Sequence, residues 1–148
     1  MFRQLAPITT LSLGVYIAAP DMINILRETR NVKMFKVAFW DHGEVVKALA
    51  LGDGSEGKKV LLPKLGMMRV RTCFRHGCEP FAVAAFVEMI ASRSPSGAAV
   101  LGVIPLQEIG VDIPSSSNTL KADMDAVLEQ WGHKTDMPHI QYERYGWD

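Results

Sequence analysis

Two cysteines and a histidine form the densest group of chemically reactive side chains in the sequence. Cys73, His76 and Cys78 lie within six residues of one another. Thiolate and imidazole are zinc ligands, but a tetrahedral site needs a fourth ligand, which would have to be His133 or His139. A cysteine nucleophile activated by His76 would in turn need a third group to orient the histidine. Since neither set is complete, we expect incidental thiols at a strand end and no metal site.

A glycine-rich run from Gly52 to Lys58 matches the first seven positions of a phosphate-binding P-loop. In such loops backbone N–H groups surround the phosphate, and a Ser or Thr after the lysine binds Mg²⁺. Here Lys59 takes that place, and residues 60–63 are expected to be extended, so no helix N-terminus would point at the anion. The run is therefore interpreted as a mobile surface loop between strands.

The overall composition is typical of one globular domain, residues 1–148. Hydrophobic residues make up 48% and charged residues 22%, so the chain is neither disordered nor fibrous. Lys plus Arg and Asp plus Glu each number 16, which leaves no overall charge to attract nucleic acid or an anionic membrane. No apolar stretch approaches the roughly 20 residues of a membrane-spanning helix. With only two cysteines, the chain is expected to be cytoplasmic, with reduced thiols.

Apolar periodicity and turn residues predict an alternation of strands and helices. Strands are expected over residues 10–18, 32–40, 44–51, 67–74, 98–104 and 138–147, and helices over residues 22–30, 80–91 and 118–131. The clearest local pattern is a hairpin between the second and third strands, because Gly43 can take the left-handed position of a bulged turn after Asp41 and His42. Residues 106–117 are expected to be irregular, and no internal repeat is expected.

Two segments could contact a partner. The helix from Phe81 to Ala91 has Glu88 as its only charge, so it is either buried against the sheet, the favoured alternative, or part of an oligomer interface. In the C-terminal tail, Tyr142, Tyr145 and Trp147 interleave with basic groups, as in surfaces that stack nucleic-acid bases. Because the chain has no basic surplus, packing of an edge strand is preferred for the tail.

The order of the elements resembles that of the GNAT superfamily, the acetyl-coenzyme A dependent N-acetyltransferases. Residues 16–26 are similar to the opening strand and first helix of that superfamily, and residues 39–51 to its hairpin of the second and third strands. Residues 127–133 are similar to the helix that ends in glycine before the last strand. The resemblance implies an α/β (α+β) fold with one mixed, mostly antiparallel sheet flanked by helices, in the order β-α-β-β-β-α-β-α-β.

The same resemblance implies a site for acetyl-coenzyme A. Its cofactor-binding residues would be Met68, Val70, Thr72, Arg75, His76, Gly77 and Cys78. The first three belong to a strand that would pair with the pantetheine arm. The last four belong to a loop whose backbone N–H groups would hold the pyrophosphate. A carboxylate such as Glu44 or Glu108, or a water, would accept the proton of the substrate amine.

Two functions therefore remain open. The first is acetyl transfer from acetyl-coenzyme A to an amine, achieved chiefly by positioning the reactants. However, the frequent general acid of the superfamily, a tyrosine, falls on Leu128, which cannot donate a proton. The second is a non-catalytic protein-binding or assembly module. Such a module would present the helix from Phe81 to Ala91, residues 106–117 or the aromatic tail to a partner or to a second copy.

Overall fold

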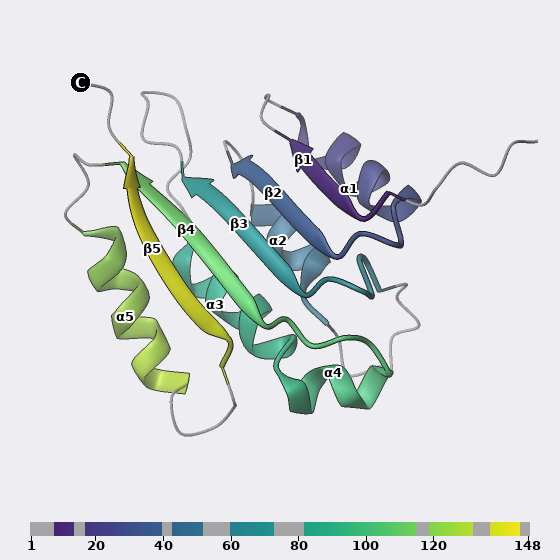
Figure 1. Ribbon diagram of the computed structural model, residues 1–148. Helices are drawn as coiled ribbons and strands as arrows, with labels where there is room; N and C mark the ends of the chain where they lie inside the picture. The colour runs from purple at the N-terminus through teal and green to yellow at the C-terminus, as the bar shows by residue number, and fades with distance from the viewer. Residues whose placement is uncertain are drawn as a thin grey trace, which may run out of the picture.

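The fold is built on a single parallel sheet. The computed structural model describes residues 8–13, 17–39, 43–51, 60–72, 82–114, 119–131 and 137–145. Its strands are β1 (Thr10–Leu13), β2 (Met34–Phe39), β3 (Met67–Thr72), β4 (Glu108–Pro114) and β5 (His139–Tyr145). All neighbouring strands are parallel, and their order across the sheet follows their order in the chain (Figure 1). Each strand must therefore be joined to the next by a crossover.

Helices supply these crossovers. They are α1 (Ala19–Glu28), α2 (Gly43–Leu49), α3 (Val83–Ser92), α4 (Pro95–Leu101) and α5 (Leu120–Trp131). Crossovers are nearly always right-handed, so a sheet that grows in one direction places its helices on one side. In Figure 1, α1, α2 and α3 lie behind the sheet, and α5 packs against α3 and the same core. Each unit of strand and helix contacts mainly its neighbours along the chain, which is the layout of a solenoid.

The helix α1 illustrates how local signals place these crossovers. Pro20 stands in its first turn, where the missing N–H has no cost, and Asp21 adds a negative charge near the positive end of the helix. The buried residues Ala19, Met22 and Leu26 are spaced three and four apart, so they share one side of the helix. This side packs into the core cluster beneath the sheet.

The side chains that face the helices form an internal repeat. Each strand, together with the two residues before it, carries the pattern apolar-x-x-apolar-x-apolar, and the five copies begin at Ile8, which is exposed, and at Val32, Leu65, Leu106 and Met137. The register aligns their second positions in one row across the sheet: Leu11, Phe35, Met68, Ile109 and Ile140. These positions are 24, 33, 41 and 31 residues apart, so the repeat has no constant period. The expectation that the chain contains no internal repeat therefore does not hold at its strands.

The sheet differs from the predicted one. A mixed, mostly antiparallel sheet in the order β-α-β-β-β-α-β-α-β was expected, whereas all four strand pairings are parallel and a helix separates every two consecutive strands. The predicted fold class and its GNAT-like order are therefore wrong, and only the α/β character is confirmed. Two segments account for most of the difference.

The first segment is residues 44–51, predicted as the second strand of a hairpin. Most of it forms α2, in which Val45, Val46 and Leu49 are buried while the two charged residues are exposed. This spacing places the apolar side chains on one side of a helix. The two valines favour a strand by intrinsic propensity. The helix prevails because it buries them against the sheet while the chain crosses to the next parallel strand.

The second segment is residues 98–104, predicted as a strand. Most of it belongs to α4. The hydroxyl of Ser94 caps the start of this helix and Pro95 is its first residue, while Gly102 caps its end in the left-handed conformation, with φ of 65°. These are standard start and stop signals of a helix. The strand β4 lies instead within residues 106–117, which were expected to be irregular.

Residues 60–63, which were expected to be extended, form a bend and turn in which Leu62 has φ of 50°. The other predictions of helices and strands are confirmed in type: the strands within residues 10–18, 32–40, 67–74 and 138–147, and the helices that overlap residues 22–30, 80–91 and 118–131. In α3, which lies next to α2 and α5, Phe86, Met89 and Ile90 are fully buried. This apolar helix is therefore buried in the core, as favoured above.

Candidate functional site

The face of the sheet opposite the helices is polar. Its residues alternate along each strand with the core residues, as the two-residue period of a strand requires. Within the described part of the chain no helix lies over this surface, which we call the open face (Figure 1). It comprises Thr10, Ser12, Met34, Lys36, Ala38, Met67, Arg69, Arg71, Glu108, Gly110, Asp112, His139, Gln141 and Glu143.

Charges of opposite sign lie on different halves of the open face. The basic residues are Lys36 on β2 and Arg69 and Arg71 on β3. The acidic residues are Glu108 and Asp112 on β4 and Glu143 on β5. These side chains are therefore spread over four strands of the open face.

Arg69 joins the two halves. Its guanidinium donates to both carboxylate oxygens of Asp112, from Nη2 at 2.6 Å and from Nε at 3.2 Å, and Nη2 also donates to Glu143. The hydrogen bond with Asp112 is the main reason that the pKa of Arg69 is raised above its ordinary value. Arg71 lies 3.9 Å from the same carboxylate, which is only 8% exposed as a residue. Charge-assisted contacts of this kind hold the arginine in one position across β4.

Gly110 makes room for this arginine. A Cβ atom added at Gly110 would lie 3.2 Å from Nη1 and 3.3 Å from Cγ of Arg69. Replacing Gly110 with valine is therefore expected to displace Arg69 from Asp112 and to lower the free energy of unfolding by about 1–2 kcal/mol, as measured by urea denaturation. In an Arg69→Met background, Gly110→Val should change the free energy of unfolding little, because no arginine is displaced and valine favours a strand more than glycine does. Equal costs in the two backgrounds would contradict this role of Gly110.

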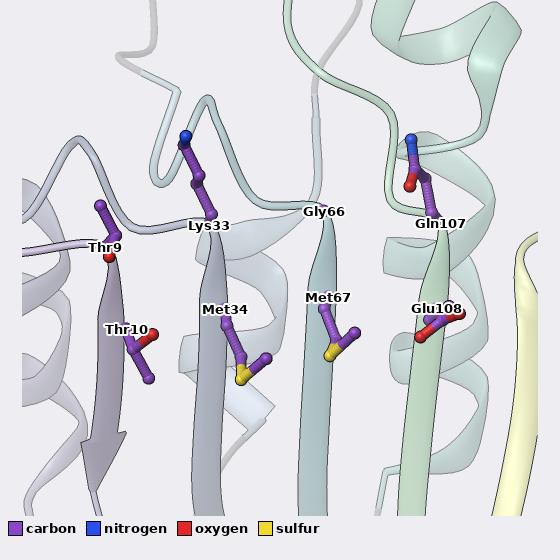
Figure 2. Close-up of a pocket in the computed structure, with 8 residues that line it drawn as sticks. All are labelled: Thr9, Thr10, Lys33, Met34, Gly66, Met67, Gln107 and Glu108. Carbon is purple, nitrogen blue, oxygen red and sulfur yellow. The ribbon is translucent and has the colours of Figure 1, made fainter.

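Two adjoining hollows lie on the open face. The first, of about 400 Å³, is at the amino ends of the strands, and Figure 2 shows Thr10, Met34, Met67 and Glu108 on the side away from the helices. The second, of about 330 Å³, lies further along the strands over Gly110. Met34, Met67 and Glu108 border both hollows, so half-exposed methionines lie beside charged groups.

The two predicted catalytic carboxylates do not meet. Glu44 is exposed in the first turn of α2, on the helical side of the sheet. Glu108 is exposed at the start of β4 and borders the hollows of the open face. The two carboxylates were predicted as alternatives, and the role of either in proton transfer stays a prediction.

The predicted cofactor-binding residues fall into two groups. Met68, Val70 and Thr72 are buried in β3, and the Thr72 hydroxyl donates to the backbone oxygen of Asp112 at 3.2 Å. Because β3 is paired with β2 on one edge and β4 on the other, a pantetheine arm would have to displace a strand to pair with it. The remaining predicted residues lie outside the described residues: Arg75, His76, Gly77 and Cys78.

Several other predicted motifs also lie outside the described residues. They are the P-loop-like run at residues 52–58, the turn at residues 41–42, and the possible zinc ligands Cys73 and His133. His139 is exposed at the start of β5. Within the described residues, no three His, Cys, Asp or Glu side chains are placed to hold a metal ion.

Sequence reasoning missed the contact between Arg69 and Asp112. The available signal was the alternation of charged and buried residues in β3, where Arg69 and Arg71 flank Val70. Asp112 likewise alternates with the buried residues Val111 and Ile113, but it belongs to residues 106–117, which were expected to be irregular. Two alternating segments of opposite charge would have indicated neighbouring strands with one polar face.

None of the described helices is long and apolar enough to cross a bilayer. Comparisons with protein-family models, with curated proteins and with solved structures found no match to this chain.

Proposed function

We propose that the protein is a non-catalytic binding module whose open face recognises another protein. The observation that carries the proposal is a parallel sheet with α1, α2, α3 and α5 on one side and no helix over the other, as far as the described residues extend. Parallel sheets are almost always covered on both faces. The open face is therefore the natural place for a partner that supplies the missing layer.

The repeated pattern of the strands supports the same function. In solenoid proteins, stacked units create extended surfaces that bind partners. One strand and one helix in each unit, with an apolar-x-x-apolar-x-apolar pattern at the strand, is also the layout of leucine-rich repeats. In such a layout the apolar positions maintain the stack, and the outward positions between them are available for recognition.

Acetyl transfer is the weaker candidate. The hypothesis depended on a mixed sheet, which is wrong, and on a pyrophosphate loop that lies outside the described residues. It remains testable by calorimetric titration with acetyl-coenzyme A. Absence of heat at millimolar ligand would count against it.

Photo-cross-linking from the two sides of the sheet tests the binding function. A photoreactive amino acid at Gln141, exposed on the open face, is expected to give a discrete cross-linked product in an extract of the source cells. The matched control position is Gln130, exposed on α5 on the helical side. Excess unmodified protein should suppress the product from position 141, because it competes for the same partner.

The yield at the two positions decides the outcome. A product that depends on position 141 and is suppressed by competition supports recognition through the open face. Equal yields at both positions, or a product from position 130 alone, would show that the open face is not the binding surface.

A further inference from the structure

The hollow over Gly110 is bordered by two charges that no other described residue neutralises. Lys36 on β2 and Glu108 on β4 are exposed, and their side chains make no ion pair or hydrogen bond within the described residues. Arg69 differs, because Asp112 and Glu143 already neutralise it. The charges available to a ligand are therefore a cation on one side of β3 and an anion on the other.

These two charges cannot reach each other easily. Lys36 is paired in register with Arg69, whereas Glu108 is paired with Met67, so the two residues lie two strands and two positions apart. With strands about 4.8 Å apart and about 3.3 Å per residue, their Cα atoms are roughly 12 Å apart. Met34 and Met67 lie half-exposed beside them. Methionine is flexible and apolar, which suits an adaptable contact with a ligand.

We propose that the hollow binds an amphipathic helix of a partner protein that lies along β3, with its apolar side on Met67, acidic residues over Lys36 and basic residues over Glu108. This proposal rests on the function proposed above. A helix about 10 Å wide that lies along β3 covers the neighbouring strand on each side. Its two flanks therefore fall over β2 and β4, where Lys36 and Glu108 lie.

The width of the open face suits a helix. Five strands about 4.8 Å apart span roughly 24 Å, so a helix about 10 Å wide can lie on the sheet with both of its flanks over strands. Helices are also the elements that cover parallel sheets.

Selection from a phage-displayed library of 20-residue helical peptides tests the proposal. Enriched peptides are expected to have apolar residues at i, i+3 or i+4, and i+7, with acidic residues along one flank of that stripe and basic residues along the other. A synthetic copy of one enriched peptide then serves as the probe, and its affinity is measured by fluorescence anisotropy.

Charge reversal assigns the flanks. Lys36→Glu is expected to weaken binding of the peptide about tenfold, because it replaces an attraction with the acidic flank by a repulsion. A second peptide, in which lysine replaces the acidic residues of that flank, should bind the Lys36→Glu variant as tightly as the first peptide binds the wild type. Lys47→Glu, exposed on α2 on the other side of the sheet, is the matched control and should leave binding unchanged.

Three results would overturn the proposal. They are a library that yields no binder, binders that lack the two charged flanks, and equal affinity for the wild type and the Lys36→Glu variant. If the cross-link from position 141 is nevertheless obtained, the proposed binding function is supported and only the helical ligand is wrong. If neither the cross-link nor a peptide binder is obtained, the proposed binding function is wrong as well.

Discussion

Replacing Arg93 with methionine is expected to lower the free energy of unfolding by about 3–5 kcal/mol. Arg93 is 0% exposed, a rare position for arginine. Its guanidinium donates to the backbone oxygens of Leu49 at 2.8 Å, Leu61 at 2.5 Å and Leu62 at 3.1 Å. Methionine fills a similar volume but has no donor. Three buried carbonyls would lose their hydrogen bonds, each at a cost of about 1–3 kcal/mol.

These carbonyls belong to backbone that no regular element satisfies. Leu49 is the last residue of α2, and the final carbonyls of a helix have no partner within it. Leu62 has φ of 50°, in the left-handed region that leucine disfavours. Burial lowers the pKa of Arg93 to about 10, so the group stays charged at neutral pH, where its charge also favours the negative end of α2. Arg93 therefore ties the ends of α2 and α3 to the turn before β3.

Urea denaturation followed by circular dichroism measures the effect. Arg93→Lys keeps the charge, but a compact ammonium group cannot reach all three carbonyls as the planar guanidinium does. We therefore expect an intermediate loss in the free energy of unfolding. Arg27→Met on α1 is the matched control, because Arg27 is exposed and its change should stay within about 0.5 kcal/mol. A loss below about 1 kcal/mol for Arg93→Met would contradict the role assigned to the three hydrogen bonds.

The second large effect is expected from Gly97→Ala in α4, which should lower the free energy of unfolding by about 3 kcal/mol. The added Cβ would lie 2.2 Å from the backbone oxygen and 3.0 Å from the backbone carbon of Ser92. These atoms belong to the end of α3 and cannot rotate away as a side chain can. The two helices would have to separate at their junction, which loosens the core around α3.

Alanine normally stabilises a helix relative to glycine by about 0.5–1 kcal/mol, so the sign of the change is diagnostic. Gly43→Ala at the start of α2 is the matched control, since an added Cβ there meets no atom of the described residues within 4 Å. Thermal unfolding should show Tm lowered by roughly 10 °C for Gly97→Ala and nearly unchanged for Gly43→Ala. Similar values for the two variants would show that α3 and α4 are not in close contact at Ser92.

Local sequence signals succeeded where periodicity and burial agree. The alternation in β3 predicts a strand with Met68 and Val70 in the core, and both are fully buried. The stripe of α5 that contains Leu120 and Met124 is likewise buried. The prediction failed for residues 44–51, because a short segment with two adjacent valines fits a strand and a helix equally well. There, packing against the sheet decides the structure.

The candidate site was much harder to predict than the helices and strands. Of the two predicted catalytic carboxylates, Glu108 lies on the open face and Glu44 on the other side of the sheet. Arg69 and Asp112 are 43 residues apart in the chain and meet only because β3 and β4 are neighbours in a particular register. Shifting that register by one residue would turn every charged side chain of β4 into the core.

By itself, the sequence determined the α/β class, most of the helices and strands, and the apolar side of each, because those features depend on spacing within a few residues. Only the tertiary structure decided that all strands are parallel, that α1, α2, α3 and α5 lie on one side of the sheet, and that Arg69 crosses Gly110 to reach Asp112 and Glu143. The reason is that strand order and register are set by contacts between residues far apart in the chain, and irregular spacing conceals the repeat that aligns them.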